Sequence, residues 1–202
     1  MPLQLDQTPI TICNSALAKL GSKFISSLDE DTKEARLCRE QYQKIKRALL
    51  YEHPWNFAKK RVTLVRSGDV PAFDYKYAFI IPADTIRILS SNLDELPPPQ
   101  SAPPVFKVEG DRFITNEDPV HVVYVSGAVD ESLFTPGFSE LLTKKLSMDL
   151  CYALVSDIQL FSMLRADYTN YAQMMRSFNA QESRPDSRLA YNGAGSYIAS
   201  RY

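Results

Sequence analysis

Histidine and cysteine are the side chains that most often bind metals or act as nucleophiles, and here their spacing suits neither role. His53 and His121 stand far apart, and neither belongs to an HExxH motif. The three cysteines, Cys13, Cys38 and Cys151, include no CxxC pair and are odd in number, which argues against a disulfide framework and a zinc ribbon. We therefore predict no metal site, no cofactor and no catalytic residue, and we expect the thiols to be buried.

Acidic residues also occur in pairs that could serve general acid–base catalysis. Each pair flanks an expected turn or helix start, where a carboxylate accepts backbone N–H bonds and remains solvated. No nucleophile elbow, S-x-x-K motif or phosphate-binding loop accompanies them. An enzyme of this sequence would have to gather its site from remote residues, and Asp84, His121 and Tyr124 are the best candidates. The acidic pairs are Asp29 with Asp31, Asp94 with Glu95, Glu117 with Asp118, and Asp130 with Glu131.

The composition limits the function classes further. The 202 residues carry 23 Lys and Arg against 24 Asp and Glu, a net charge of −1 that argues against a general nucleic-acid coat. No window approaches 18 uninterrupted apolar residues, so we expect no membrane-spanning helix. The N-terminus lacks the basic start and apolar run of a signal peptide, which favours a cytosol or an assembly compartment.

Helical periodicity marks both ends of the chain. Apolar residues recur every three or four positions in about residues 9–20, and again from Ala35 to Leu49. For the second helix, Asp31 and Glu34 have the spacing of a capping box. Two more helices are expected after Pro136, with a break where Ser156 and Gln159 repeat that spacing. The stretch from Leu146 to Val155 is so apolar that we expect it to be covered on nearly all sides.

The middle of the chain has the period of β-strands. Strands are predicted at residues 61–65, 75–81, 85–89 and 121–125, and a hairpin at 105–115 turns at Glu109–Gly110–Asp111. The sequence therefore predicts an α+β fold, an antiparallel bundle of two N-terminal and two C-terminal helices with a small antiparallel β domain inserted. The expected parts are residues 1–60 and 130–183 for the bundle, 61–129 for the β domain and 184–202 for an extended C-terminal arm.

Trp55 is the sole tryptophan, and it lies where helix is expected to change to strand. Pro54 precedes it and Phe57 follows, so these three residues are predicted to form a structural junction. Trp55 is interpreted either as a buried plug of that hinge or as an interface anchor.

The C-terminal segment 184–202 has no period and holds too few large apolar side chains to compensate for the entropy of ordering it alone. It contains three arginines, one aspartate and three tyrosines. Arginine and tyrosine are enriched at protein interfaces. It is either a disordered end or an arm that folds onto a partner, and we favour the arm.

Taken together, several stretches resemble the head-to-tail adaptors of short-tailed phages, the family of tail tubular protein A. The resemblance covers about residues 9–182, and the junction at residues 50–58, LYEHPWNFA, is its most specific part. The other stretches are residues 13–21 with 25–28, 75–79 before 81–84, 108–111 with 114–116, and Phe138 with Leu141, Leu142, Leu146 and Leu150.

The resemblance implies a structural virion protein that acts without catalysis. Such a chain would form a ring of twelve subunits that joins the portal protein to the tail nozzle protein, and DNA would pass through its lumen without sequence-specific binding or any contact with a membrane. It would be located at the head–tail junction of the virion, and in the host cytoplasm during assembly. We expect the arm to bind the portal through Arg188, Leu189, Tyr191, Tyr197, Arg201 and Tyr202. The alternatives are a non-enzymatic interaction module or regulator outside a virion, and a small enzyme.

Overall fold

The computed structural model describes residues 7–94, 96 and 104–182. Its helices are α1 (Pro9–Lys19), α2 (Lys33–Glu52), α3 (Pro136–Leu154) and α4 (Ile158–Glu182), with the 3-10 turns η1 (Asn56–Ala58) and η2 (Glu131–Leu133). Its strands are β1 (Lys59–Thr63), β2 (Val65–Arg66), β3 (Tyr77–Ile80), β4 (Thr85–Ser91), β5 (Phe106–Glu109), β6 (Arg112–Thr115) and β7 (His121–Ser126). The predicted α+β class is confirmed. The predicted arm, residues 184–202, lies outside the described residues.

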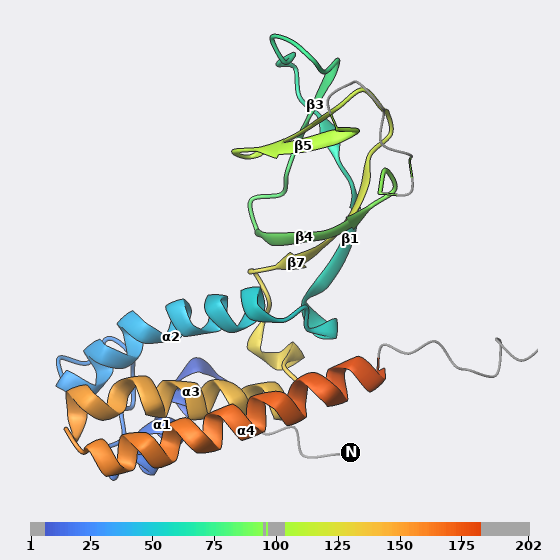
Figure 1. Ribbon diagram of the computed structural model, residues 1–202. Helices are drawn as coiled ribbons and strands as arrows, with labels where there is room; N and C mark the ends of the chain where they lie inside the picture. Colours follow the sequence, from blue (N-terminus) through green and yellow to red (C-terminus); the bar gives the residue numbers. More distant parts are fainter. Residues whose placement is uncertain (1–6, 95, 97–103, 183–202) are drawn as a thin grey trace, which may run out of the picture.

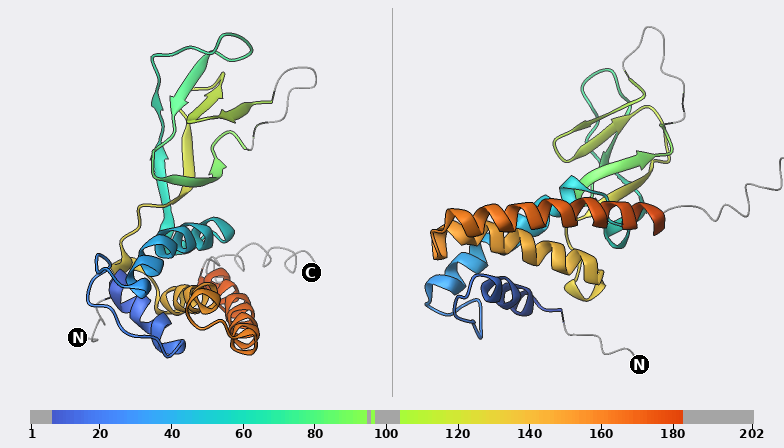
Figure 2. Two further views of the ribbon diagram at one scale, coloured as in Figure 1. Left: turned by 90° about the vertical axis from the view of Figure 1, so that its left-hand side faces the viewer. Right: turned by 60° about the horizontal axis from the view of Figure 1, so that its bottom comes forward.

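The four helices pack together with α3 at their centre, and we call them the helical layer (Figures 1 and 2). Helix α3 packs against α1, α2 and α4, and its side chains Phe138, Leu142 and Leu146 are completely buried. The expectation that residues 146–155 are covered on nearly all sides is wrong at their C-terminal end. There Tyr152 is 77% exposed, and Ala153 and Val155 are exposed as well.

Two predicted helix starts are corrected. Helix α2 is capped by Thr32 instead of Asp31, since the Thr32 hydroxyl accepts the N–H of Ala35. At the α3–α4 break, Asp157 accepts the N–H groups of Gln159 and Leu160. Ser156 adopts a φ of 57° and reverses the chain instead of capping the next helix. In both places the sequence spacing pointed to a residue next to the one that caps.

The strands form two antiparallel sheets, ordered β1-β7-β4 and β2-β3-β6-β5, which we call together the β module. The predicted strand at 61–65 is two strands in different sheets. The chain changes sheet at Leu64, which is buried and donates its N–H to the Val120 carbonyl. The predicted hairpin is confirmed as β5 and β6, with Gly110 at a φ of 60° in the turn. Leu64 joins Phe79, Phe113 and Val120 in a core separate from that of the helices.

The β module projects from one side of the helical layer, beside the C-terminal end of α2 (Figure 1). The chain enters it after Glu52 and returns through residues 127–135 to α3. Two crossings of the chain therefore determine how the module sits on the helices. Within the part of the chain that the structure describes, no helix has both the length and the apolar character needed to cross a membrane.

The central position of α3 gives a direct test. Leu146→Ala removes a fully buried side chain and is expected to lower the free energy of unfolding by about 2–5 kcal/mol. Met163→Ala on α4, where the side chain is 69% exposed, is the control and should change it by less than about 0.5 kcal/mol. Urea unfolding followed by circular dichroism measures both, and equal effects would contradict a core built around α3.

Candidate functional site

The junction between the helical layer and the β module is built around Trp55. Its side chain is 3% exposed, and its indole N–H donates to the carbonyl of Leu49, in the last turn of α2, at 3.0 Å. That carbonyl has no partner within the helix, so the bond satisfies two buried polar groups at once. The ring meets Phe138 of α3 edge-on at 5.2 Å. Trp55 thus occupies the position of a buried plug, the first of its two interpretations.

Aromatic rings join the two crossings of the chain to each other. Phe57, on the way into the β module, lies 5.5 Å from Phe134, on the way out, and 4.9 Å from Phe138 at the start of α3. Phe134 and Phe138 are themselves 4.8 Å apart. Edge-on and tilted pairs at these distances are favourable beyond the area that they bury. The cluster holds the incoming and outgoing chains together against α3.

Asn179 of α4 fastens the incoming chain from the other side. Its side-chain oxygen accepts the N–H of Asn56 at 3.0 Å, and its main-chain carbonyl accepts the side-chain amide of Asn56 at 3.1 Å. Its amide group lies 2.8 Å from His53 Nε2 and donates to the Pro54 carbonyl at 3.4 Å. Burial lowers the pKa of His53, and Arg176, Lys59 and Arg87 lower it further. A neutral imidazole can accept the bond from the Asn179 amide, so the environment of His53 favours this bond. We call the contacts of Asn179 with His53, Pro54 and Asn56 the clamp.

A buried lysine fastens the outgoing chain to α2. Lys46 is 5% exposed, and its ammonium group contacts Glu131 at 2.8 Å and the Val129 carbonyl at 2.7 Å. The Tyr42 hydroxyl donates to the same carboxylate at 3.2 Å, while burial and the charge of Glu131 raise the pKa of Tyr42. Removing one partner of such a pair leaves a buried charge without compensation. The pair therefore fixes η2, and with it the return path of the chain, on α2.

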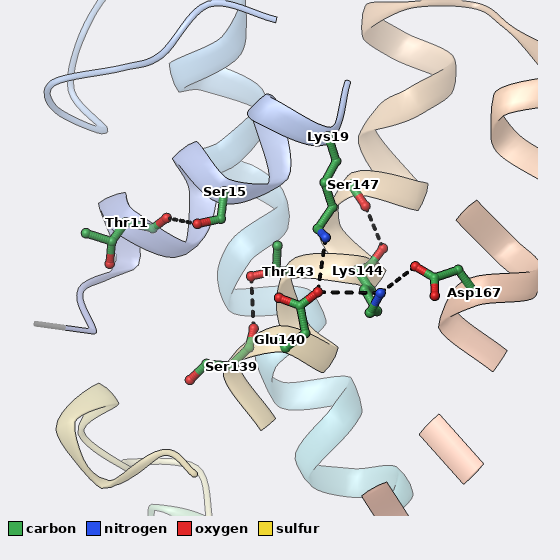
Figure 3. A network of polar contacts seen from close by, with 9 residues as sticks. All are labelled: Thr11, Ser15, Lys19, Ser139, Glu140, Thr143, Lys144, Ser147 and Asp167. Carbon is green, nitrogen blue, oxygen red and sulfur yellow. Dashed lines mark hydrogen bonds and ion pairs between the residues drawn. The ribbon is translucent and has the colours of Figure 1, made fainter. Parts of the chain in front are cut away.

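A second polar network sets the register of three helices (Figure 3). Lys19 of α1 contacts Glu140 of α3 at 3.0 Å, Lys144 contacts the same carboxylate at 3.4 Å, and Lys144 also pairs with Asp167 of α4. Lys144 lies 5.2 Å from the centre of the Tyr171 ring. These groups are partly exposed, so each pair contributes little energy. Their arrangement ties α1, α3 and α4 together.

The residues considered for an enzyme are brought together only in part. Asp84 accepts bonds from Lys60 at 2.8 Å, Ser126 at 2.6 Å and Tyr124 at 3.2 Å. His121 lies elsewhere and bonds with Thr63, Nδ1 to Oγ1 at 2.9 Å. Burial by itself would raise the pKa of Asp84, but the bonds from Lys60, Ser126 and Tyr124 outweigh it and hold the pKa below the usual value. An ionised carboxylate with this many donors cross-links β1, β7 and the β3–β4 connection.

Two of the predicted acidic pairs contribute a carboxylate that accepts a backbone N–H, and Glu95 lies outside the described residues. Asp130 accepts the N–H of Ser132 at 2.8 Å, and Asp94 accepts the N–H of Ser91 at 2.6 Å. The three cysteines are free and buried, as predicted. Among residues 7–94, 96 and 104–182, no three His, Cys, Asp or Glu side chains gather in a group that could hold a metal ion.

The six residues predicted to bind a portal all lie in the segment 184–202, outside the described residues. Sequence reasoning missed Asn179 and Lys46, which complete the junction. Their signal was weak, because each directly follows an apolar residue in a helix: Asn179 follows Phe178, and Lys46 follows Ile45. The chain matches no protein-family model, and no curated protein sequence matches it either.

The clamp can be tested by removing its central side chain. Asn179→Ala leaves the Asn56 N–H without its side-chain partner and is expected to lower the free energy of unfolding by about 1–3 kcal/mol. Asn170→Ala, on the exposed face of the same helix, is the control and should be nearly neutral. Urea unfolding distinguishes them, and similar values for the two variants would show that Asn179 is not a clamp.

The Asp84 network predicts a pH dependence. Because the pKa of Asp84 is lowered on folding, its ionised form stabilises the fold above the ordinary value of 3.8, and this stabilisation disappears as the pH falls through the folded-state pKa. Asp84→Asn should therefore be less stable than the natural chain at neutral pH, and the difference should narrow below about pH 4. Urea midpoints across the pH range measure it, with Asp29→Asn, 89% exposed, as control. A difference that stays constant with pH would refute the assignment.

Proposed function

We propose that this chain is a head-to-tail adaptor subunit of a short-tailed phage. In this proposal the subunits dock as a ring, taken as twelve copies, beneath the portal protein, and the ring receives the tail nozzle protein while DNA passes through its lumen. The stretches described above, the PWNF junction above all, resemble that family. The chain would act through its shape and its surfaces.

The observation that carries the proposal is that exposed apolar side chains lie at two distant ends of the subunit, whose β module is held on the helical layer. At one end, the α3–α4 turn exposes Tyr152 and Ile158, each 77%. At the other, the loop between β2 and β3 exposes Val70 by 69% and Phe73 by 77%. All views place these ends far apart (Figures 1 and 2). Apolar side chains that gather at one exposed place favour contact with another protein, and two such places suit a protein that connects different neighbours.

The faces of the helical layer support side-by-side packing of subunits. Helix α2 exposes many charged side chains, which favour contact with water: Lys33, Arg36, Arg39, Glu40, Lys44 and Arg47. Helix α4 is different. It has four charged residues, and two of them, Asp167 and Arg176, already form ion pairs within the subunit. Its exposed face presents neutral residues such as Met163 and Met174. We assign this face to the contact with the next subunit of the ring, and the β module to the nozzle side.

The net charge of −1 also suits a channel for DNA. Each lysine or arginine that pairs with a phosphate adds a salt-dependent contact, and many of them would hold the duplex in place. A ring of near-neutral subunits lets DNA slide. The arm would supply the grip on the portal instead, through tyrosine anchors that become ordered on binding.

Deleting residues 184–202 tests the proposal. Helix α4 ends at Glu182, so the truncated chain should keep the unfolding transition of the full chain but lose attachment to portal rings. Co-sedimentation with purified portal rings measures attachment, and a chain whose last 19 residues are replaced by a Gly/Ser segment of equal length controls for bulk. Normal attachment of the truncated chain would exclude the arm as the portal anchor. A full chain that never binds portal rings would contradict the adaptor function and favour an interaction module outside a virion.

A further inference from the structure

The loop between β2 and β3 holds an exposed phenylalanine in a fixed backbone conformation. The N–H of Tyr75 donates to the carbonyl of Phe73 at 2.8 Å and closes a three-residue turn. Asp74, at its centre, has a φ of 66°, which is unfavourable for a residue other than glycine. A strained turn persists only where its surroundings hold it.

Asn116, which follows β6, supplies that support. Its side-chain oxygen accepts the N–H of Lys76 at 2.9 Å, and its amide group donates to the carbonyl of Asp74 at 3.4 Å. These two bonds lie on either side of Tyr75 and tie the end of the turn to the residue that follows β6. An aromatic side chain presented in this way loses little backbone freedom when a partner covers it.

A hollow of about 420 Å³ lies beneath the loop. Its floor is the face of the β2-β3-β6-β5 sheet that points away from the module's core, where Tyr75, Ala78 and Ile114 form a small cluster of their own. Its wall is the loop itself, with Val70, Pro71 and Phe73. Tyr75 is fixed there by its hydroxyl, which donates to the Pro104 carbonyl at 2.9 Å. We call these six residues the tip surface.

The rim of the tip surface has an excess of negative charge. Asp69 and Asp111 share Arg112, at 3.6 Å and 2.7 Å. Asp74 and Glu109 also border the hollow and have no ion pair among the described residues, and Lys107 is the other cation on the rim. Asp111 is not part of the lining, so three carboxylates there, Asp69, Asp74 and Glu109, face two cations. A partner that fits would place lysine or arginine beside an apolar or aromatic side chain.

We propose that the tip surface is the docking site for the tail nozzle protein, with Phe73 as its anchor and a basic-flanked apolar segment of the nozzle as its occupant. The assignment of the partner rests on the proposed function. The arm starts from the end of α4 in the helical layer, whereas the β2–β3 loop is the part of the β module farthest from that layer (Figure 1). A subunit that reaches the portal through the arm presents the tip surface to the component beyond it.

The test uses the full chain docked on portal rings, with binding of purified nozzle protein measured by biolayer interferometry. Phe73→Ser removes the anchor and should weaken nozzle binding roughly tenfold or more. Glu109→Lys should weaken it less, and the loss should shrink at high salt. Phe24→Ser is the matched control, because Phe24 is also an exposed phenylalanine, 69% against 77%, but lies between α1 and α2. It should bind the nozzle normally.

The outcomes separate this inference from the proposed function. If Phe73→Ser assembles on portal rings and binds the nozzle as tightly as the natural chain, the tip surface is not the docking site and the adaptor function stands. If Phe24→Ser loses nozzle binding instead, the site lies on the helical layer and not at the tip surface. If the natural chain binds no portal ring, the proposed function fails and the assignment to the nozzle fails with it. If Phe73→Ser unfolds at the same temperature as the natural chain, a loss of nozzle binding is not caused by a loss of fold.

Discussion

The structure depends on satisfying buried polar groups where the chain twice crosses between helices and sheets. Each crossing would leave N–H and C=O groups in an apolar environment, at a cost of several kcal/mol in all unless partners are supplied. Trp55 and Asn179 supply them on the way in, and Lys46 supplies them on the way out. The partners come from α2 and α4, so the same bonds that satisfy the crossings also fasten the β module to the helical layer.

This arrangement gives a subunit of two separate cores that behaves as one body. The aromatic contacts among Phe57, Phe134 and Phe138 close the junction, and Asp84 fastens β1 to β7 just beyond it. The β module is therefore joined to the helices by side-chain contacts as well as by the two chain crossings. Such a body suits a protein whose work is to keep two other components at a fixed distance and orientation.

The α+β class and the positions of most helices and strands follow from periodicity, because apolar residues at steps of three and four or at every second position must face a core. The helix caps were misplaced by one residue at Thr32 and Asp157, since neighbouring polar side chains compete for the same N–H groups. The sequence predicts a junction at Pro54, Trp55 and Phe57 but gives no sign of Asn179, because its partners His53 and Asn56 lie more than a hundred positions away. Periodicity also cannot show that Lys60 and Ser126 both bond to Asp84. Their meeting depends on the register between β1 and β7 in the sheet.

Cryo-electron microscopy of the purified particle tests the adaptor function most directly. The proposal predicts a ring of this chain between portal and nozzle, with the C-terminal end of α4 toward the portal and the β2–β3 loop toward the nozzle. A particle that lacks the chain at this junction, or a ring whose β modules point into the portal, would contradict it.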